Sequence, residues 1–290
     1  MPHRRNPDFV SMPNRETALG IIGLGIIGSR VAANYRDSGH PVWIWNRSPK
    51  ALPGFLGSPE EVARRATRLF IYVADGPAAL AVIDRLAPAL TPAHIICNHT
   101  TLGPDEAREC GRRVQAAGAQ YLDAPFTGSR DAAAQRQIVY YVGGAETTLR
   151  EIEPILQINA KAILPMGGIG DASLMKVATN LVSAGIVSVL AEALTVVRAA
   201  GGDPDKFALA LANNASRSAT TDMKLAGMLA QDFEPRFSLK HMVKDNRLGR
   251  DLAAAHGLPL PSVETFIAKG EALMQQGFGE NDFSVLGRTE

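Results

Sequence analysis

The sequence predicts an α/β domain with a mostly parallel, doubly wound sheet, followed by an all-α domain that a long helix joins to it. Three observations lead to this fold class. Short apolar runs alternate with helical periodicity in the first half, which is typical of a parallel sheet with helices on both faces. After Pro165 the strand-like runs stop and only helical patterns follow. The length of 290 residues, of which 46% are apolar and 20% charged, suits two globular domains.

The first half contains a series of apolar runs of strand length. They are Ala18–Ile22, Val42–Trp45, Leu69–Val73, Ile95–Cys97, Tyr121–Leu122 and Ile138–Val142, with Ile163–Leu164 as a further short strand. Helical patterns lie between most of these runs, over Ile27–Ser38, Pro59–Arg65, Pro77–Leu90 and Asp105–Ala117. This alternation predicts that each strand lies parallel to its neighbours, with the helices covering the sheet.

The second half reads as helices. The first and longest covers Asp171–Ala200, and Gly201-Gly202 ends it, because glycine adopts the left-handed C-terminal conformation without steric cost. Asp203 and Pro204 then provide the N-cap and first turn of the next helix. Further helices are expected over Ser218–Leu229, Leu239–Ala255 and Ser262–Gln275.

The domain boundary is expected in the glycine-rich segment 167–170. We therefore predict a dinucleotide-binding domain over residues 17–168 and a helical substrate-binding and dimerisation domain over residues 169–290. Residues 1–16 contain no apolar core of signal-peptide length. We expect them to form a disordered leader, with Met12 as an alternative start.

A glycine-rich turn follows the first predicted strand. Its residues are Gly23, Leu24, Gly25, Ile26, Ile27 and Gly28, a G-x-G-x-x-G pattern between a strand and a helix. The first glycine permits the tight turn, the second lets the backbone approach a pyrophosphate, and the third lets helix and strand pack closely. This position at the first βα crossover predicts a Rossmann domain that binds a dinucleotide phosphate at the helix N-terminus. The alternative is a tight structural turn without a ligand.

The end of the second strand indicates which dinucleotide binds. NAD enzymes place an acidic residue about 20 residues after the glycine turn, against the ribose 2′-hydroxyl. Here the strand ends in Asn46-Arg47-Ser48, and no acidic residue lies between Ser38 and Ser58. Arg47 can pair with a 2′-phosphate and Ser48 can donate to it, so we expect NADP. A solvated arginine in a loop remains the alternative.

Four motifs together make the sequence resemble the β-hydroxyacid dehydrogenase family, which includes 3-hydroxyisobutyrate dehydrogenase. They are the glycine turn with Asn46-Arg47-Ser48, the segment Asp123-Ala124-Pro125-Phe126-Thr127-Gly128-Ser129, the segment from Gly167 through Lys176 to Asn180, and Lys244-Asp245. The stretch Phe237-Ser238-Leu239-Lys240-His241 is similar to the glyoxylate and succinic semialdehyde reductase branch. Thr127, Arg136 and the run Asn98–Thr101 depart from the usual family residues, and these departures concern the substrate rather than the chemistry.

The resemblance implies the chemistry of hydride transfer between a nicotinamide and a small aldehyde acid. Lys176 and Asn180 are four residues apart and share one face of the long helix. We expect the Lys176 ammonium to stabilise and protonate the carbonyl oxygen in reduction, and Asn180 to orient the lysine or the hydroxyl. The alternative is a surface lysine beside an amide.

The remaining site residues are expected at strand ends and on a later helix. Thr127, Gly128 and Ser129 lie at the carboxyl edge of the sheet and suit a substrate carboxylate, unless they only cap a turn. Thr101 follows another strand end and suits the nicotinamide ribose or the substrate. Val73 and Ala74, at the end of the third run, are assigned to the cofactor. By resemblance, Lys244 faces the nicotinamide and Asp245 supports the site.

Two residues of the later helix have open roles. Lys240 lies four residues before Lys244 and is expected either to bind the substrate carboxylate or to lie on a solvated face. Phe237 is expected to form a wall of the pocket, or simply to be part of the core.

Composition excludes several classes of protein. The net charge of +1 gives no basic excess for nucleic acid. Two cysteines fit a reducing cytoplasm, and the histidines show no metal-ligand spacing, so no metal is expected. The apolar stretch Leu181–Val197 is short for a membrane span and suggests burial in a homodimer or homotetramer. Rival functions are an imine reductase of the same superfamily, against which Lys176 argues, and a non-catalytic NADP-binding regulator.

Overall fold

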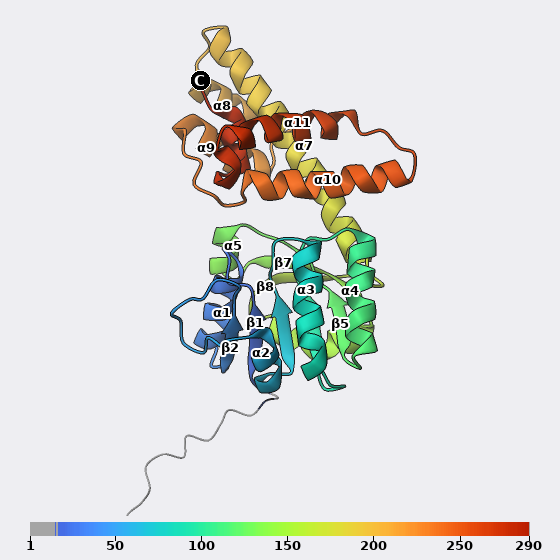
Figure 1. The fold of residues 1–290 in the computed structure, drawn as a ribbon. Helices are drawn as coiled ribbons and strands as arrows, with labels where there is room; N and C mark the ends of the chain where they lie inside the picture. Colours follow the sequence, from blue (N-terminus) through green and yellow to red (C-terminus); the bar gives the residue numbers. More distant parts are fainter. Residues whose placement is uncertain (1–14, 16, 290) are drawn as a thin grey trace, which may run out of the picture.

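The structure, a computed structural model, describes Arg15 and residues 17–289. Apart from Arg15, the leader expected over residues 1–16 therefore lies outside the described residues. The first half of the chain forms an α/β layer, and the second half forms a group of helices that packs on it. One long helix runs from the α/β layer into the helical group (Figure 1).

The described residues of the first half form an eight-stranded sheet in the order β2-β1-β3-β4-β5-β7-β6, with β8 paired to β7. The strands are β1 (Leu19–Ile22), β2 (Val42–Trp45), β3 (Arg68–Ile71), β4 (Ile95–Asn98), β5 (Gln120–Asp123), β6 (Phe126–Thr127), β7 (Ile138–Gly144) and β8 (Ala160–Gly167). β1 to β5 are parallel, β7 is antiparallel to β5 and β6, and β8 is parallel to β7. The predicted mostly parallel sheet is confirmed.

Helices cover both faces of this sheet, as a doubly wound fold requires. They are α1 (Gly28–Asp37), α2 (Pro59–Arg65), α3 (Gly76–Leu86), α4 (Pro104–Ala116), α5 (Arg130–Ala134) and α6 (Glu146–Leu156), with a 3-10 turn at Ala87–Ala89. One buried apolar cluster joins the sheet to α1, α5 and α6, and a second joins its other face to α2, α3 and α4. The core of the first half therefore lies in two layers, and the carboxyl ends of β1 to β5 remain free for a site.

The sequence analysis missed β6, α5 and α6 and made β8 too short. β6 has two residues and α5 has five, so neither is long enough to show a period. α6 buries Leu149, Ile152 and Leu156 at helical spacing, but Pro154 within it obscured the pattern. Thr127, expected at the end of a parallel strand, lies instead in β6, because β5 ends at Asp123 and the chain then pairs antiparallel with β7.

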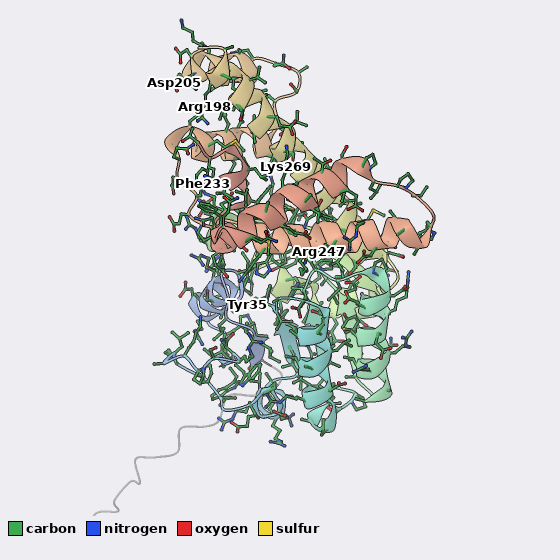
Figure 2. All side chains as sticks on the ribbon, turned by 45° about the horizontal axis from the view of Figure 1, so that its top comes forward. Tyr35, Arg198, Asp205, Phe233, Arg247 and Lys269 are labelled. Atoms are coloured by element: carbon green, nitrogen blue, oxygen red, sulfur yellow. The ribbon has the colours of Figure 1, made fainter. Side chains whose placement is uncertain are left out.

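The second half is all helical among its described residues, as predicted. Its helices are α7 (Asp171–Ala199), α8 (Pro204–Ala212), α9 (Ala219–Ala230), α10 (Leu239–Ala255) and α11 (Pro261–Gln275), followed by 3-10 turns at Phe278–Glu280 and Phe283–Gly287. The Asp203 side chain caps α8 by accepting a hydrogen bond from the Asp205 N–H, at 2.9 Å. α10 lies across the top of the α/β layer, and Asp205 lies at the distal end of the arm formed by α7 and α8 (Figures 1 and 2).

Candidate active site

The glycine turn joins β1 to α1 and leaves its first N–H groups free. Gly23 has φ +96°, and a Cβ there would lie 2.0 Å from the carbonyl oxygen of Tyr72, so no larger residue fits. A Cβ on Gly25 would instead meet nothing within 4 Å. Among the described residues, the N–H groups of Gly25, Ile26 and Ile27 have no acceptor. Free N–H groups at a helix N-terminus, with space in front of them, fit the pyrophosphate of a dinucleotide.

Asn46 ties the end of β2 to this turn. Its Oδ1 accepts a hydrogen bond from the Leu24 N–H at 2.9 Å, and its Nδ2 donates to the Ser48 carbonyl at 2.9 Å. Arg47 and Ser48 are exposed next to it, where the sequence predicts the 2′-phosphate. Lys50, which the sequence analysis did not identify, donates to the Leu24 carbonyl at 2.6 Å. Two cationic side chains therefore lie at this end of the turn.

The ends of β3 and β4 complete this edge of the sheet. Val73 is half-buried and Ala74 exposed directly after β3. Behind them, Asn98 is fully buried and holds the turn after β4, because its Oδ1 accepts from the Thr100 N–H at 3.1 Å. Thr101 follows, half-buried, with its carbonyl directed to the second half of the chain, where Lys244 donates to it at 2.8 Å.

The start of α7 is fixed by a buried carboxylate that the sequence analysis assigned only by resemblance. Asp123, at the end of β5, accepts hydrogen bonds from the N–H groups of Gly170 at 3.0 Å and Ser173 at 2.9 Å, and from the Ser173 hydroxyl at 2.7 Å. Burial raises the pKa of Asp123, and these three donors oppose that shift. Since Lys176 lies one turn further along α7, Asp123 fixes the position of the helix turn that carries this lysine.

Four side chains form a continuous polar chain in the site. Lys176 Nζ donates to Asn180 Oδ1 at 2.9 Å, Asn180 Nδ2 donates to Asp245 Oδ2 at 2.6 Å, and Asp245 Oδ1 lies 2.7 Å from Lys244 Nζ. Lys244 connects this chain to Thr101, on the α/β side. The structure thus brings together residues from α7, α10 and the end of β4 that the sequence placed in one site.

Lys176 is buried, with 8% of its surface exposed, and its pKa is lowered to about 8. Burial is the main cause, because it disfavours the charged form. The negative charge of Asp245 raises the pKa and the positive charge of Lys244 lowers it. A lysine with a pKa near neutral pH can both donate and accept a proton, which suits general acid–base chemistry.

The predicted substrate segment lies beside α5. Thr127 is exposed, and its hydroxyl has no hydrogen-bond partner within residues 17–289. Gly128 has φ +146°, and Ser129 caps α5 through the Ala132 N–H at 3.5 Å. Ser129 therefore has the local capping role that was the alternative to substrate binding, while the Thr127 hydroxyl is open to a ligand.

The two remaining predicted residues, Phe237 and Lys240, lie before and at the start of α10. Phe237 is half-buried, with its ring edge against Phe283 and its face towards His241. Lys240 Nζ lies 2.5 Å from Glu280 and does not join the polar chain of Lys176. This position agrees with the solvated face that the sequence left open for Lys240. His241, which was not selected from the sequence, is half-buried beside Phe237, one turn before Asp245.

Two family models match this chain, one for each half. Residues 18–168 match the NAD binding domain of 6-phosphogluconate dehydrogenase, and residues 170–289 match the NAD-binding domain of NADP-dependent 3-hydroxyisobutyrate dehydrogenase. The chain belongs to the β-hydroxyacid dehydrogenase family. As a β-hydroxyacid dehydrogenase it is an oxidoreductase that uses a nicotinamide dinucleotide, and the free N–H groups of the glycine turn fit that cofactor.

Relatives along the whole chain agree with this β-hydroxyacid dehydrogenase assignment. 2-Hydroxy-3-oxopropionate reductase of Escherichia coli (strain K12) is 29% identical, covering 92% of this chain and 95% of that protein. Glyoxylate/succinic semialdehyde reductase 2, chloroplastic, of Arabidopsis thaliana is 24% identical, covering 93% and 78%. A solved structure of 3-hydroxyisobutyrate dehydrogenase of Mycobacterium tuberculosis with L-serine has a TM-score of 0.84 at 25% identity, covering 93% and 98%.

Proposed function

We propose that the protein is an NADPH-dependent reductase that interconverts a small aldehyde acid, of the glyoxylate or succinic semialdehyde type, and its hydroxy acid. The observation that carries this proposal is the polar chain from Lys176 through Asn180 and Asp245 to Lys244. The relatives that act on 2-hydroxy-3-oxopropionate and on glyoxylate or succinic semialdehyde support the substrate class.

Each residue of the chain has a distinct part in this reaction. A bound nicotinamide would supply the hydride to the carbonyl carbon. Lys176 donates a proton to the carbonyl oxygen, which becomes the hydroxyl, and the lysine is left neutral. Asn180 points its Oδ1 at Lys176 because its Nδ2 is held by Asp245. Lys244 balances the charge of Asp245, which keeps the pKa of Lys176 low enough for proton transfer in both directions.

A screen of carbonyl acids with NADPH tests this function. We expect succinic semialdehyde or glyoxylate to be reduced with kcat/KM at least about tenfold above the matching uncharged aldehyde, because Thr127 and the N–H groups near Gly128 suit one carboxylate. The comparison is succinic semialdehyde against butanal, in the wild type and in Thr127→Val. Equal rates on the two aldehydes would contradict the carboxylate contact. A preference for cyclic imines would favour an imine reductase, and binding of NADPH without turnover would favour a regulator.

NADPH preference is tested at Arg47. The exposed Arg47 and the lack of a nearby acidic residue support binding of the 2′-phosphate. Loss of a charge-assisted phosphate contact costs about 1.5–3 kcal/mol. Arg47→Glu is therefore expected to raise the KM for NADPH far more than that for NADH. A wild type with equal or higher kcat/KM for NADH would overturn the preference.

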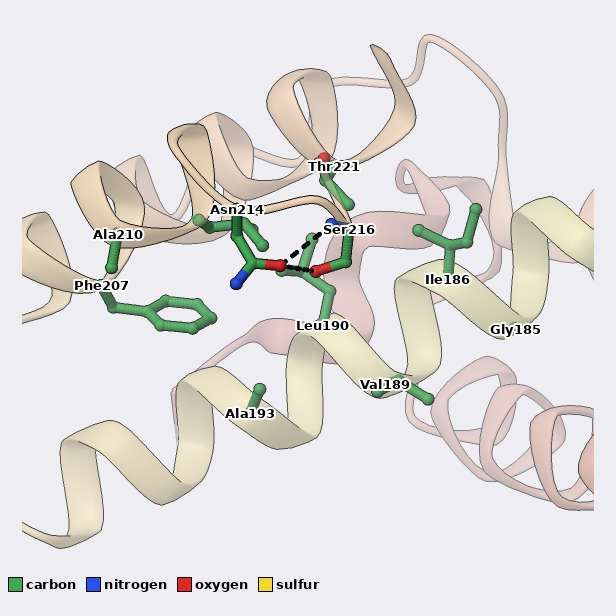
Figure 3. Close-up of a pocket in the computed structure, with 11 residues that line it drawn as sticks. Gly185, Ile186, Val189, Leu190, Ala193, Phe207, Ala210, Asn214, Ser216 and Thr221 are labelled. Atoms are coloured by element: carbon green, nitrogen blue, oxygen red, sulfur yellow. Dashed lines mark hydrogen bonds between the residues drawn. The ribbon is translucent and has the colours of Figure 1, made fainter. Parts of the chain in front are cut away.

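We also propose that two copies of the chain associate through α7 and α8. Val182, Val189 and Val196 recur every seven residues along α7 and are 63%, 65% and 66% exposed. Among the described residues, α8 buries none of its side chains, although its sequence is largely apolar. Between α7, α8 and α9 lies an apolar groove of about 610 Å³, in which Phe207 faces Ala193 and Leu190 (Figure 3). In water, such a surface favours association.

The composition of this surface favours a second copy as its occupant. Eleven residues line the groove, and Val182 and Val196 extend the apolar surface to thirteen residues, about half of the roughly 20–30 that each partner contributes to a stable interface. By length and composition α7 also qualifies as a membrane span, with mean hydropathy 1.8. However, Ala184, Val187 and Leu194 pack into the helical core, and Glu192 pairs with Lys269. A helix with one face in a protein core and an ion pair on its side suits a protein partner better than lipid.

A further inference from the structure

α10 lies across the top of the α/β half (Figure 1) and is attached to it at two places. Before its N-terminus, Arg236 Nε lies 3.3 Å from Asp131 Oδ2, and Glu234 pairs with Arg130. Arg130 and Asp131 directly follow the substrate segment that ends in Ser129. The second attachment is in the second turn of α10, where Lys244 donates to the Thr101 carbonyl. The first two turns of α10 therefore lie opposite the substrate segment, between the two attachments.

The side chains of α10 divide into three rows. Leu239, Met242, Val243 and Asn246 are buried, and the apolar ones belong to the helical core. Lys240 and Arg247 form a second row, which pairs with Glu280 and Glu271. His241, Lys244 and Leu248 form the third row, spaced three and four residues apart and therefore on one face.

The third row faces the α/β half. Lys244 contacts the Thr101 carbonyl, and Leu248 Cδ2 lies 3.8 Å from where a Cβ on Gly103 would be. His241 precedes these residues by one and two turns on the same face. It therefore lies on the side of α10 that faces the α/β half, one turn before Asp245, which contacts Asn180.

The His241 ring is held in place but makes no hydrogen bond among the described residues. It lies nearly parallel to the Phe237 ring, at 13° and with 6.4 Å between ring centroids. Burial lowers the pKa of His241, and Lys244 and Lys240 lower it further, while Asp245 and Glu280 act in the opposite direction. A neutral imidazole keeps one N–H donor and one acceptor, and neither has a partner within residues 17–289.

We propose that His241 is a substrate-binding residue, which donates a ring N–H hydrogen bond to the carboxylate of the aldehyde acid while Phe237 fixes the ring orientation. The inference rests on the proposed function and names a specificity residue for it. His241 takes the place that the sequence gave to Lys240, whose ammonium is engaged with Glu280 on another face of α10.

The test compares His241→Leu with His241→Gln, which retains a side-chain N–H donor. His256→Leu is the matched control, because His256 is exposed at the other end of α10. For His241→Leu we expect the KM for succinic semialdehyde to rise about tenfold, with kcat within about twofold and kcat/KM for butanal unchanged. His241→Gln restores part of the loss. A binding measurement without turnover accompanies this: titration of succinate onto the enzyme with NADP⁺, where His241→Leu weakens succinate about tenfold and leaves NADP⁺ affinity unchanged.

The outcomes separate this inference from the proposed function. A wild type that reduces aldehyde acids, with His241→Leu unchanged in KM and in succinate affinity, overturns the role of His241 and leaves the function intact. Equal losses for the acid and for butanal also overturn it, because they indicate a packing role. A wild type that reduces no aldehyde acid contradicts the proposed function itself, and succinate titration then reports on His241 alone.

Discussion

Neighbouring side chains determine both the direction of the Lys176 Nζ and its pKa. Asn180 fixes the direction of its Nζ, and Asp245 and Lys244 oppose each other in their effect on its pKa. At the residue scale, the reactivity of this lysine is therefore a property of the whole polar chain. It depends on burial and on the balance of two neighbouring charges, neither of which shows in the local sequence.

The pH dependence of the reaction is expected to follow this lysine. With a pKa lowered to about 8, Lys176 is protonated below that pH and neutral above it. Reduction needs the ammonium, so its kcat/KM should fall as pH rises through about 8; oxidation needs the neutral amine, so its kcat/KM should rise over the same range. Rate profiles in both directions measure this.

Lys176→Ala provides the control for these profiles. It is expected to lower kcat about a hundredfold or more. It should also abolish the change in kcat/KM near pH 8, both for reduction and for oxidation. NADPH affinity should change little, because the glycine turn and Arg47 lie in the other half of the chain. Near wild-type turnover in this variant would exclude Lys176 from proton transfer.

Site residues could be predicted from the sequence where their partners lie only a few residues away in the chain. Lys176 and Asn180 share a helix face, so their proximity was predictable. Lys50 was not selected, because the Leu24 carbonyl that it contacts lies 26 residues away in the chain. His241 was not selected, because only the fold shows which face of α10 is turned towards the α/β half. Arg136, which departs from the usual family residue, has a left-handed φ of 59°, a conformation that its sequence does not indicate because arginine adopts it rarely.

At the scale of elements, the site depends on how α7 joins the sheet. Asp123 ends β5 and accepts three hydrogen bonds from the first turn of α7. The glycine-rich segment before α7 predicted a boundary, but the carboxylate that secures it comes from another strand, about fifty residues earlier in the chain. α7 and α10 were predicted almost to the residue, while β6 and α5 were too short to predict from periodicity.

Asp123→Ala is expected to destabilise this junction. It leaves the buried N–H groups of Gly170 and Ser173 without an acceptor, which costs about 2–4 kcal/mol together. Asp123→Asn retains one acceptor oxygen and should lose less. Denaturant unfolding measures the stability of both variants, and kcat is expected to fall in Asp123→Ala because Lys176 is displaced. An alanine variant of wild-type stability would show that the start of α7 does not depend on Asp123.

At the scale of the whole molecule, the arm of α7 and α8 is expected to be the surface where two copies meet. Val189→Asp places a charge among the residues that line the apolar groove and should convert the dimer into a monomer. Light scattering after size-exclusion chromatography gives the mass. Leu258→Asp is the matched control, because Leu258 is also exposed, at 60%, but lies between α10 and α11. A wild type that is monomeric at micromolar concentration would contradict the dimer.

The order of the elements has a consequence for synthesis on the ribosome. The glycine turn, Arg47 and the strands of the sheet all precede Gly168, whereas Lys176, Asn180, Lys244 and Asp245 all follow it. Since domains generally fold as units from the N-terminus as the chain emerges, the sheet with its glycine turn can fold before the helices that carry Lys176 and Lys244 have left the ribosome. The half that holds the glycine turn can therefore fold without the proposed proton donor, and the site becomes complete only when the later helices pack against it.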